Sequence, residues 1–347
     1  MCRSMRNSAL SLSLSLLLAS LVCVVPVALR AGSSGKPIEI WFKPLTWTVK
    51  ESGHGVEYSK HDFPALLKPD APWQTAASQV SVLGLPQNVV WSYPDRPELI
   101  GFFARNRFKV AFVTSMMFTA AACGKGVEGI SPDADVNRET VIIAQKWKEA
   151  GGSLDYIIMD SPYYFGHAFP KGCRYAINDV AQRTATTLAR IVKYFPNVQI
   201  VDAEGPGAMS NDAWLSDMGS WFKSFQEASG RSIYAVAMDL HWTDLRPGNT
   251  WQQTARKASD FFHGRGVRSG LYINTANQPG MTDAEWMEEN RQHIRDAVAG
   301  GIDLDFFLIS SWHNHPRVNL PESDPTSYTS LVEFASEARQ PKQSLPR

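Results

Sequence analysis

The sequence lacks an excess of charge of either sign. Its 347 residues include 34 Lys and Arg and 34 Asp and Glu, so the formal net charge is zero. Runs of basic residues are also absent beyond the extreme N-terminus. Proteins that bind nucleic acid through its phosphates carry clusters of Lys and Arg. The composition therefore argues against a nucleic-acid partner.

Patterns that divide a chain or bind a nucleotide are missing as well. No low-complexity linker, composition break or internal repeat separates the sequence into parts, and no Gly-x-Gly-x-x-Gly motif follows the first predicted strand. That motif binds dinucleotide phosphates, so we expect no cofactor of this kind and, on the residues alone, no cofactor at all. Apolar residues make up 44% of the chain and charged residues 20%, a composition that supports one large buried core.

The N-terminal segment has the pattern of a secretory signal. Arg3 and Arg6 precede an uncharged stretch rich in Leu, Val, Ala and Ser, which ends close to the small residue Ala31. A basic region, an apolar region and a small residue at the cut are the parts of such a signal. We predict that residues 1–31 are removed and that 32–347 form one secreted or periplasmic catalytic domain. The alternative is an uncleaved membrane anchor, because the stretch is just long enough to span a bilayer.

Cysteine is scarce, with four residues in the chain, and two of them lie in the predicted signal. The remaining pair is Cys123, after the third predicted strand, and Cys173, after the fourth. Neighbouring strands bring these two loops side by side, and an exported protein meets an oxidising environment. We predict a disulfide between Cys123 and Cys173, with two separate buried thiols as the alternative.

The sequence does contain a regular alternation of strand-like and helix-like segments. Each strand-like segment is a short run of β-branched, aromatic and aliphatic residues, as expected of parallel strands buried on both faces. The predicted strands are Ile38–Leu45, Val80–Leu85, Lys109–Met116, Leu154–Asp160, Val198–Glu204, Ser232–His241, Val267–Thr275 and Asp303–Trp312. Segments with helical spacing lie between them, at Pro94–Asn106, Asn137–Ala150, Asn178–Tyr194, Asn211–Ser229, Thr250–His263 and Thr282–Ala299.

Glycines end most of these predicted helices just before the next strand, where a left-handed residue terminates a helix. They are Gly151-Gly152, Gly230, Gly264 and Gly300-Gly301. Strand–helix units in series indicate a parallel sheet with right-handed crossovers, and eight units favour closure of that sheet on itself. We therefore predict an α/β protein whose single domain is a (β/α)₈ TIM barrel.

Polar residues end several of the later predicted strands. In a barrel of this kind the active site lies at the C-terminal ends of the strands. Asp160 ends the fourth strand, Glu204 the fifth and Asp239 the sixth, and Asp202 shares one face of its strand with Glu204. Sugar rings need flat apolar platforms beside hydrogen-bonding groups, and the candidates for binding a substrate are Tyr163, His241, Trp242, Asn274, Trp312 and His313.

Acids at neighbouring strand ends fit the hydrolysis of glycosidic bonds. One carboxylic acid protonates the leaving oxygen, and a second carboxylate acts as nucleophile or activates water. Crowding raises the pKa of one acid, which can then stay protonated near neutrality. We predict that two of Asp160, Glu204 and Asp239 carry the reaction, with Asp160 as nucleophile or base and either of the others as acid. The sugar, the linkage and the stereochemical course stay open.

In architecture and strand-end chemistry the chain, from Ile38 to Phe334, resembles the (β/α)₈ glycoside hydrolases. In the clan of the α-galactosidase-type barrels the nucleophile is an Asp that ends strand four, and the acid/base is an Asp that ends strand six. Asp160 and Asp239 match these two positions. In the cellulase-type clan the acids are Glu at strands four and seven, and Asp160 and Asn274 depart from that pattern. Glu204, on strand five, belongs to neither scheme.

Two other functions are alternatives. A metal- or histidine-dependent hydrolase such as a phosphodiesterase would use His241, His313 and His315, although adjacent loop histidines without a third placed ligand are a weak metal signal. A barrel that binds carbohydrate without cleaving it would have an aromatic groove, with carboxylates too far apart to cooperate. We expect a carbohydrate as the partner, no metal, and a monomer.

Overall fold

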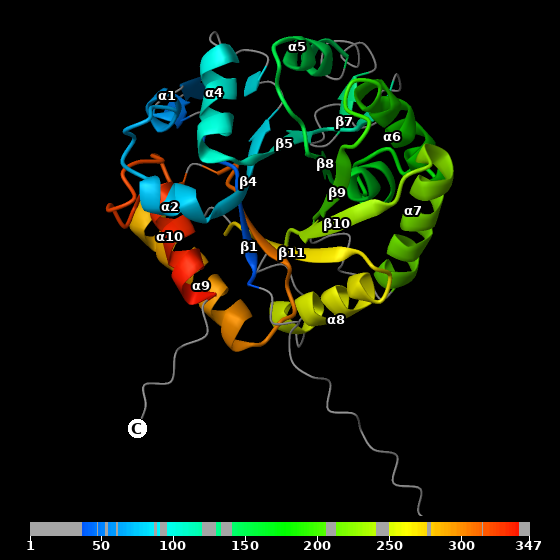
Figure 1. The fold of residues 1–347 in the computed structure, drawn as a ribbon. Coiled ribbons are helices and arrows are strands. Elements are labelled where there is room, and N and C mark those ends of the chain that lie inside the picture. Colours follow the sequence, from blue (N-terminus) through cyan, green and yellow to red (C-terminus); the bar gives the residue numbers. More distant parts are fainter. Residues whose placement is uncertain are drawn as a thin grey trace, which may run out of the picture.

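In the computed structural model, eight parallel strands close into a barrel (Figure 1). The described residues are 37–46, 48–52, 55–59, 62–86, 89–90, 96–119, 130–132, 141–205, 213–240, 250–275, 279–313 and 315–339. Neighbouring strands follow the order β1-β12-β11-β10-β9-β8-β5-β4. Their bounds are β1 Glu39–Phe42, β4 Val80–Pro86, β5 Lys109–Thr114, β8 Tyr156–Asp160, β9 Gln199–Glu204, β10 Ile233–Met238, β11 Arg268–Ile273 and β12 Phe306–Ile309. The predicted TIM barrel is confirmed.

Helices surround the barrel and lead the chain from one strand to the next (Figure 1). The longer helices are α4 Arg96–Asn106, α6 Ile177–Val192, α7 Trp214–Ser229, α8 Trp251–His263, α9 Asp283–Ala299 and α10 Tyr328–Ala338. Shorter segments are α1 Phe63–Leu66, α2 Gln74–Gln79, α5 Ile143–Glu149 and the π-helix η3 Tyr164–Ala168. Two strand pairs lie outside the barrel sheet, one formed by β2 Thr48–Ser52 and β3 Gly55–Ser59, the other by β6 Met117–Thr119 and β7 Ile130–Pro132.

Each predicted strand overlaps one strand of the barrel, and most barrel strands are shorter than expected. Thr282 caps α9, because its hydroxyl accepts the N–H of Glu285 and the Glu285 side chain accepts the N–H of Thr282. Gly230 ends α7 in the left-handed conformation, as predicted. The prediction for Gly264 is wrong: it is right-handed, and the left-handed residue is Gly266 with a φ of 71°. The sequence also failed to predict α10.

Large aromatic residues fill the barrel from its N-terminal end. Trp41 stacks on Phe306 with ring centroids 4.2 Å apart, and Tyr156 lies 4.8 Å from Trp41. Gly270 makes room for this stack, because a Cβ atom there would lie 2.2 Å from the Phe306 ring. Nearer the C-terminal end, Ala203 on β9 faces into the barrel. The interior is therefore densely packed at one end and lined by smaller side chains at the other.

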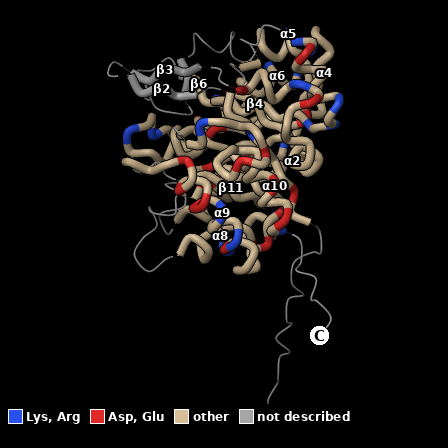
Figure 2. Tube along the Cα trace, turned by 90° about the vertical axis from the view of Figure 1, so that its left-hand side faces the viewer, with Lys and Arg blue, Asp and Glu red and all other residues tan. Residues whose placement is uncertain are grey.

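No helix in the described ranges is long and apolar enough to cross a membrane. Segments carrying Lys and Arg are interspersed with segments carrying Asp and Glu in Figure 2. The predicted signal, residues 1–31, lies outside the described residues, so its cleavage stays a prediction.

Candidate active site

Two carboxyl groups face the interior at the C-terminal end of the barrel. Asp160 is the last residue of β8 and is paired with Ala203 on β9, which is in turn paired with Ala237 on β10. Asp239 follows β10, and its N–H donates to the carbonyl of Glu204 at 3.0 Å, so the strand pairing continues to this residue. Because side chains alternate along a strand, Asp160 and Asp239 lie on the same inward face as the two alanines. Both acids are half-buried.

The two alanines leave space between the acids. β8 and β10 are separated by β9 alone, and the register places Asp239 two residues beyond the level of Asp160. Two strand spacings together with two residues of rise correspond to roughly 12 Å between the Cα atoms of the two acids. Ala203 fills little of that gap, so both Asp side chains can extend toward a bond that lies between them. This arrangement brings together two of the three acids predicted from the sequence.

The ends of β11 and β12 add buried polar groups to this mouth. Asn274 follows β11 and is 3% exposed, and Ser310 follows β12 and is 1% exposed. Both follow inward-facing residues by two positions, Tyr272 and Leu308 respectively. Neither the amide of Asn274 nor the hydroxyl of Ser310 has a hydrogen-bond partner among the described residues. Buried polar groups are almost always hydrogen-bonded, so we expect water or a ligand to supply the partners of this pair.

An aromatic pair stands beside these groups. Tyr272 and Trp312 meet edge to face with ring centroids 5.8 Å apart. Trp312 is 40% exposed, and the ring of His313 packs against it with ring centroids 5.4 Å apart. An exposed indole supported by a buried tyrosine is the kind of platform on which a sugar ring packs. The predicted roles of Asn274, Trp312 and His313 therefore have a consistent location, and they stay predictions.

Sequence reasoning missed three residues of the mouth: Lys43, Tyr272 and Ser310. Lys43 follows inward-facing Trp41 by two positions, and its Cβ lies 3.7 Å from the position that a Cβ on Gly84 would occupy. The rule that places active-site residues at strand ends could have found Lys43. The predicted first strand, Ile38–Leu45, extended past it, and so the end of β1 was misplaced.

Glu204 faces the other way. Its side chain is fully buried, and its two carboxyl oxygens accept the N–H groups of Tyr163 at 3.0 Å and Tyr164 at 3.1 Å. Asp202, on the same face of β9, accepts the indole N–H of Trp221 on α7 at 2.7 Å. This face packs against the helices, whereas Ala203 occupies the inward position. The sequence predicted Glu204 beside the other two acids; alternation showed that Asp202 and Glu204 share a face, but not which face.

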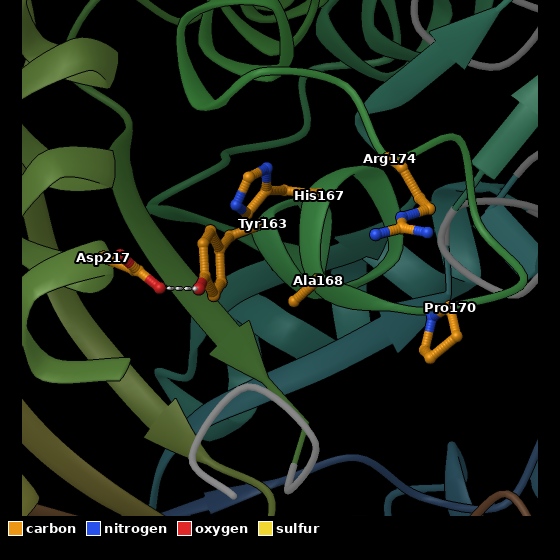
Figure 3. Close-up of a pocket in the computed structure, with 6 residues that line it drawn as sticks. All are labelled: Tyr163, His167, Ala168, Pro170, Arg174 and Asp217. Atoms are coloured by element: carbon orange, nitrogen blue, oxygen red, sulfur yellow. Dashed lines mark hydrogen bonds between the residues drawn. The ribbon is translucent and has the colours of Figure 1, made fainter. Parts of the chain in front are cut away.

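Tyr163 also lies outside the mouth. Its ring is buried, and its hydroxyl donates to Asp217 on α7 at 3.4 Å. Together with His167 and Arg174 these residues line a separate pocket of about 350 Å³ between η3 and α7 (Figure 3). Burial, and then the negative charges of Asp217 and Glu204, raise the pKa of Tyr163. The predicted contact of Tyr163 with a substrate in the mouth is therefore not supported by its position.

The histidines do not assemble into a metal centre where the chain is described. His315 is buried and bonded through Nδ1 to Asp283, in the first turn of α9. No group of three or more His, Cys, Asp and Glu side chains that could hold a metal occurs in the described part of the chain. His241, Trp242 and Cys123 lie outside the described residues, so their predicted roles stay untested.

No family model matches the chain, and no curated protein matches its sequence. Many solved structures share its fold. One is a mutant xylanase A from P. fluorescens subsp. cellulosa in complex with xylopentaose, with 12% identity and a TM-score of 0.51, covering 86% of this chain and 98% of the other.

Two further similar structures come from different sources. The intracellular xylanase TsXylA from Thermoanaerobacterium saccharolyticum, in complex with xylotetraose, has 10% identity and a TM-score of 0.51, covering 81% of this chain and 90% of the other. An endoxylanase of family GH10 from a sugarcane soil metagenome has 11% identity and a TM-score of 0.50, covering 84% and 90%. At such low identity these likenesses establish the fold: a (β/α)₈ barrel of the kind seen in glycoside hydrolases.

Proposed function

We propose that this chain is a glycoside hydrolase and that Asp160 and Asp239 are its catalytic carboxyl groups. One observation carries the proposal: both acids lie on the inward face at the C-terminal ends of β8 and β10, with small Ala203 between them. Hydrolysis of a glycosidic bond requires two carboxyl groups that flank the bond. The same two strand positions carry the acids in the α-galactosidase-type barrels that the sequence resembles.

The roles of the two acids follow from the reaction. Asp239 donates a proton to the leaving glycosidic oxygen. Asp160 either attacks the anomeric carbon or takes a proton from the attacking water, and one water molecule is consumed per bond cleaved. Glu204 has no place in this pair, because its side chain is fully buried behind β9. The two-carboxylate mechanism needs no cofactor.

The remaining groups of the mouth suit a neutral sugar. The buried amide of Asn274 can both donate to and accept from sugar hydroxyls, and Ser310 adds a third partner. Trp312 offers a ring face for the apolar side of a sugar. Xylo-oligosaccharides are bound by two of the similar structures, so xylan fragments are suitable first substrates to test. In the cellulase-type pattern, however, the residue at the Asn274 position is Glu, so other glycosides belong in the same panel.

The test is a screen for sugar release. Purified protein is incubated with chromogenic glycosides, xylan, galactan and other polysaccharides, and reducing ends are measured over time, with Asp160→Asn as the matched inactive control. The proposal expects turnover of at least one class by the wild type and its loss in the variant. A wild type that binds an oligosaccharide without cleaving it would instead identify a binding barrel. Equal activity of wild type and variant would reject the assignment of Asp160.

We also propose that the protein is exported, with the N-terminal segment as its signal. The basic start, the apolar stretch and Ala31 support this. N-terminal sequencing of the protein recovered from the medium or periplasm should then begin at Gly32. Recovery of the full chain, starting at Met1 and associated with membranes, would identify an anchor instead.

A disulfide between Cys123 and Cys173 is part of the same proposal. Cys173 is half-buried between η3 and α6 and packs against the main core. Such a bond would stabilise the domain by about 2–4 kcal/mol. Thiol titration of the unfolded, unreduced protein should detect no reactive thiol from these two residues, and two reactive thiols would reject the bond.

A further inference from the structure

Glu204 and Asp202 form a buried pair of acids directly behind the strand end that carries Asp160. Both side chains are fully buried and lie two residues apart on the outward face of β9. Asp202 accepts the indole N–H of Trp221 through Oδ2, and its Oδ1 has no hydrogen-bond partner among the described residues. Two negative charges cannot share such a site without a proton, so the pair holds at least one.

The turn after Asp160 is held from this side. Ser161 adopts a φ of 45°, which is rare for a residue with a side chain. Its N–H and its hydroxyl both donate to the carbonyl of Ala203, each at 2.8 Å. Pro162 has no N–H group. The N–H groups of the two residues after it, Tyr163 and Tyr164, both donate to the carboxyl group of Glu204. The strained turn is therefore fixed to β9 by one carbonyl and one carboxylate.

We propose that Glu204 is a positioning residue: its carboxylate holds the turn so that Asp160 is presented to the barrel mouth, and Asp202 is the member of the buried pair that carries a proton. The positioning role rests on the proposed catalytic function of Asp160. Glu204 touches no substrate in this account, and it acts only through the segment that follows Asp160.

The hydrogen bonds place the proton on Asp202. Both oxygens of Glu204 accept a backbone N–H, which favours the ionised form of this acid. On Asp202, Oδ2 accepts from Trp221, whereas Oδ1 receives no donor from the described residues and can carry a proton. Burial raises the pKa of both acids, that of Asp202 to about 7 and that of Glu204 well above its usual range, so the pair holds a proton at neutral pH. The backbone N–H groups of Tyr163 and Tyr164 oppose the rise at Glu204 alone, and on this ground we place the proton on Asp202. Other titratable groups close to the pair are Asp160, Tyr163 and Asp217.

Two isosteric variants distinguish the assignments. Asp202→Asn removes the charge and keeps an oxygen for Trp221, so it copies a protonated Asp202. Glu204→Gln turns one of the two acceptors of the turn into a donor. Amide hydrogen exchange of Tyr163 and Tyr164, measured on the full chain, reads the turn directly. We expect exchange at both amides to rise about tenfold or more in Glu204→Gln, since each lost bond corresponds to roughly one order of magnitude, and to stay at the wild-type rate in Asp202→Asn.

The kinetic readout uses whichever substrate the wild type cleaves. A positioning role predicts that Glu204→Gln lowers kcat by about tenfold or more with little change in KM, because Asp160 is misplaced while the sugar-binding groups are intact. Asp155→Ala is the control: Asp155 accepts the N–H of Val110 at 2.8 Å at the opposite end of the barrel. This variant should lower stability, but it should leave the Tyr163 and Tyr164 amides and kcat unchanged.

Each outcome decides one part of the proposal. Unchanged exchange at Tyr163 and Tyr164 in Glu204→Gln would overturn the positioning role. Fast exchange in Asp202→Asn together with protection in Glu204→Gln would place the proton on Glu204 instead. If no substrate is found, the exchange data still test the turn, so a failure of the proposed glycosidase function remains distinguishable from a failure of this proposal.

Discussion

The N-terminal end of the barrel carries a network of ion pairs, whereas two buried polar side chains at the C-terminal end have no hydrogen-bond partner in the described part of the chain. At the N-terminal end, Arg268 bonds Glu39 at 3.0 Å and Asp305 at 3.5 Å, and Asp305 also bonds His263 at 2.8 Å. At the C-terminal end, the buried groups of Asn274 and Ser310 have no partner in the described part of the chain. In TIM barrels the first end serves stability and the second carries the active site. Under the proposed function, the groups at the C-terminal end meet a sugar and the charge network at the N-terminal end does not.

The largest effect should come from the acids at the C-terminal end. Asp160→Asn should lower kcat by about two to four orders of magnitude on every substrate, since it removes the nucleophile or base. Asp239→Asn should do so mainly on substrates with poor leaving groups, which need protonation. Rates on matched nitrophenyl and alkyl glycosides measure the difference, and thermal melting serves as the folding control. Equal losses on both leaving groups in Asp239→Asn would remove Asp239 from the role of acid.

The ends should also respond to pH with opposite signs. Burial raises the pKa of Asp202 to about 7, so its contribution to stability is complete below the unfolded pKa near 4 and is lost as the pH rises toward 7. The free energy of unfolding should fall by on the order of 3–4 kcal/mol over this window, and Asp202→Asn should remove the fall. Denaturant unfolding at a series of pH values measures both curves, and parallel curves for wild type and variant would contradict the assignment.

Asp305, near the opposite end, should behave in the reverse sense. Burial alone would raise the pKa of Asp305, but the hydrogen bonds from His263 and the N–H of Ser269, with the charge of Arg268, outweigh it and lower the pKa. Its contribution is therefore present above the unfolded pKa and lost as the pH falls through the lower folded value. Asp305→Asn should flatten the acid side of the stability curve and leave the neutral side unchanged. If Asp305→Asn instead removed the fall in the free energy of unfolding between pH 4 and 7, the pH dependence assigned to Asp202 would belong to Asp305.

A smaller effect is expected for the charge network at the N-terminal end. Arg268→Met removes the partner of Glu39 and of one Asp305 oxygen, and it should cost about 1–3 kcal/mol of stability. Because this end is remote from the acids of the mouth, kcat and KM should stay at wild-type values. Denaturant unfolding measures the stability, and a steady-state assay measures kcat and KM. A large loss of kcat with unchanged stability would contradict the assignment of the active site to the C-terminal end.

The smallest change in stability should come from Asn274. Asn274→Leu replaces an unpaired buried amide by an apolar side chain of similar size, so stability should be unchanged or higher by about 1 kcal/mol. Substrate binding should weaken, with KM raised about tenfold, because the amide supplies its hydrogen bonds to the ligand. A clear loss of stability without a change in KM would show that the amide has a structural partner and that the mouth is not assembled around it.

The sequence predicted the barrel well because its periodic signals are strong. Short apolar runs and capped helices recur along the chain. Thr282 caps the start of α9 and Gly230 ends α7 in the left-handed conformation, as predicted. The candidate site was harder to predict, since a strand pattern gives which residues share a face but not which face points inward. Glu204 was misplaced for this reason. Tyr163 was misplaced because it directly precedes η3, and the direction of that segment does not follow from strand alternation. Lys43 was missed because the predicted first strand was longer than β1.

The central claim, that the inward-facing acids of the C-terminal mouth flank the bond to be cleaved, is tested most directly by a crystal structure of Asp160→Asn with an oligosaccharide that the wild type hydrolyses. The account predicts the sugar in the mouth, with one glycosidic oxygen within hydrogen-bond distance of Asp239, hydroxyls on Asn274 and Ser310, and a ring against Trp312. A sugar bound only in the pocket of His167 and Arg174, with the mouth filled by water, would contradict it.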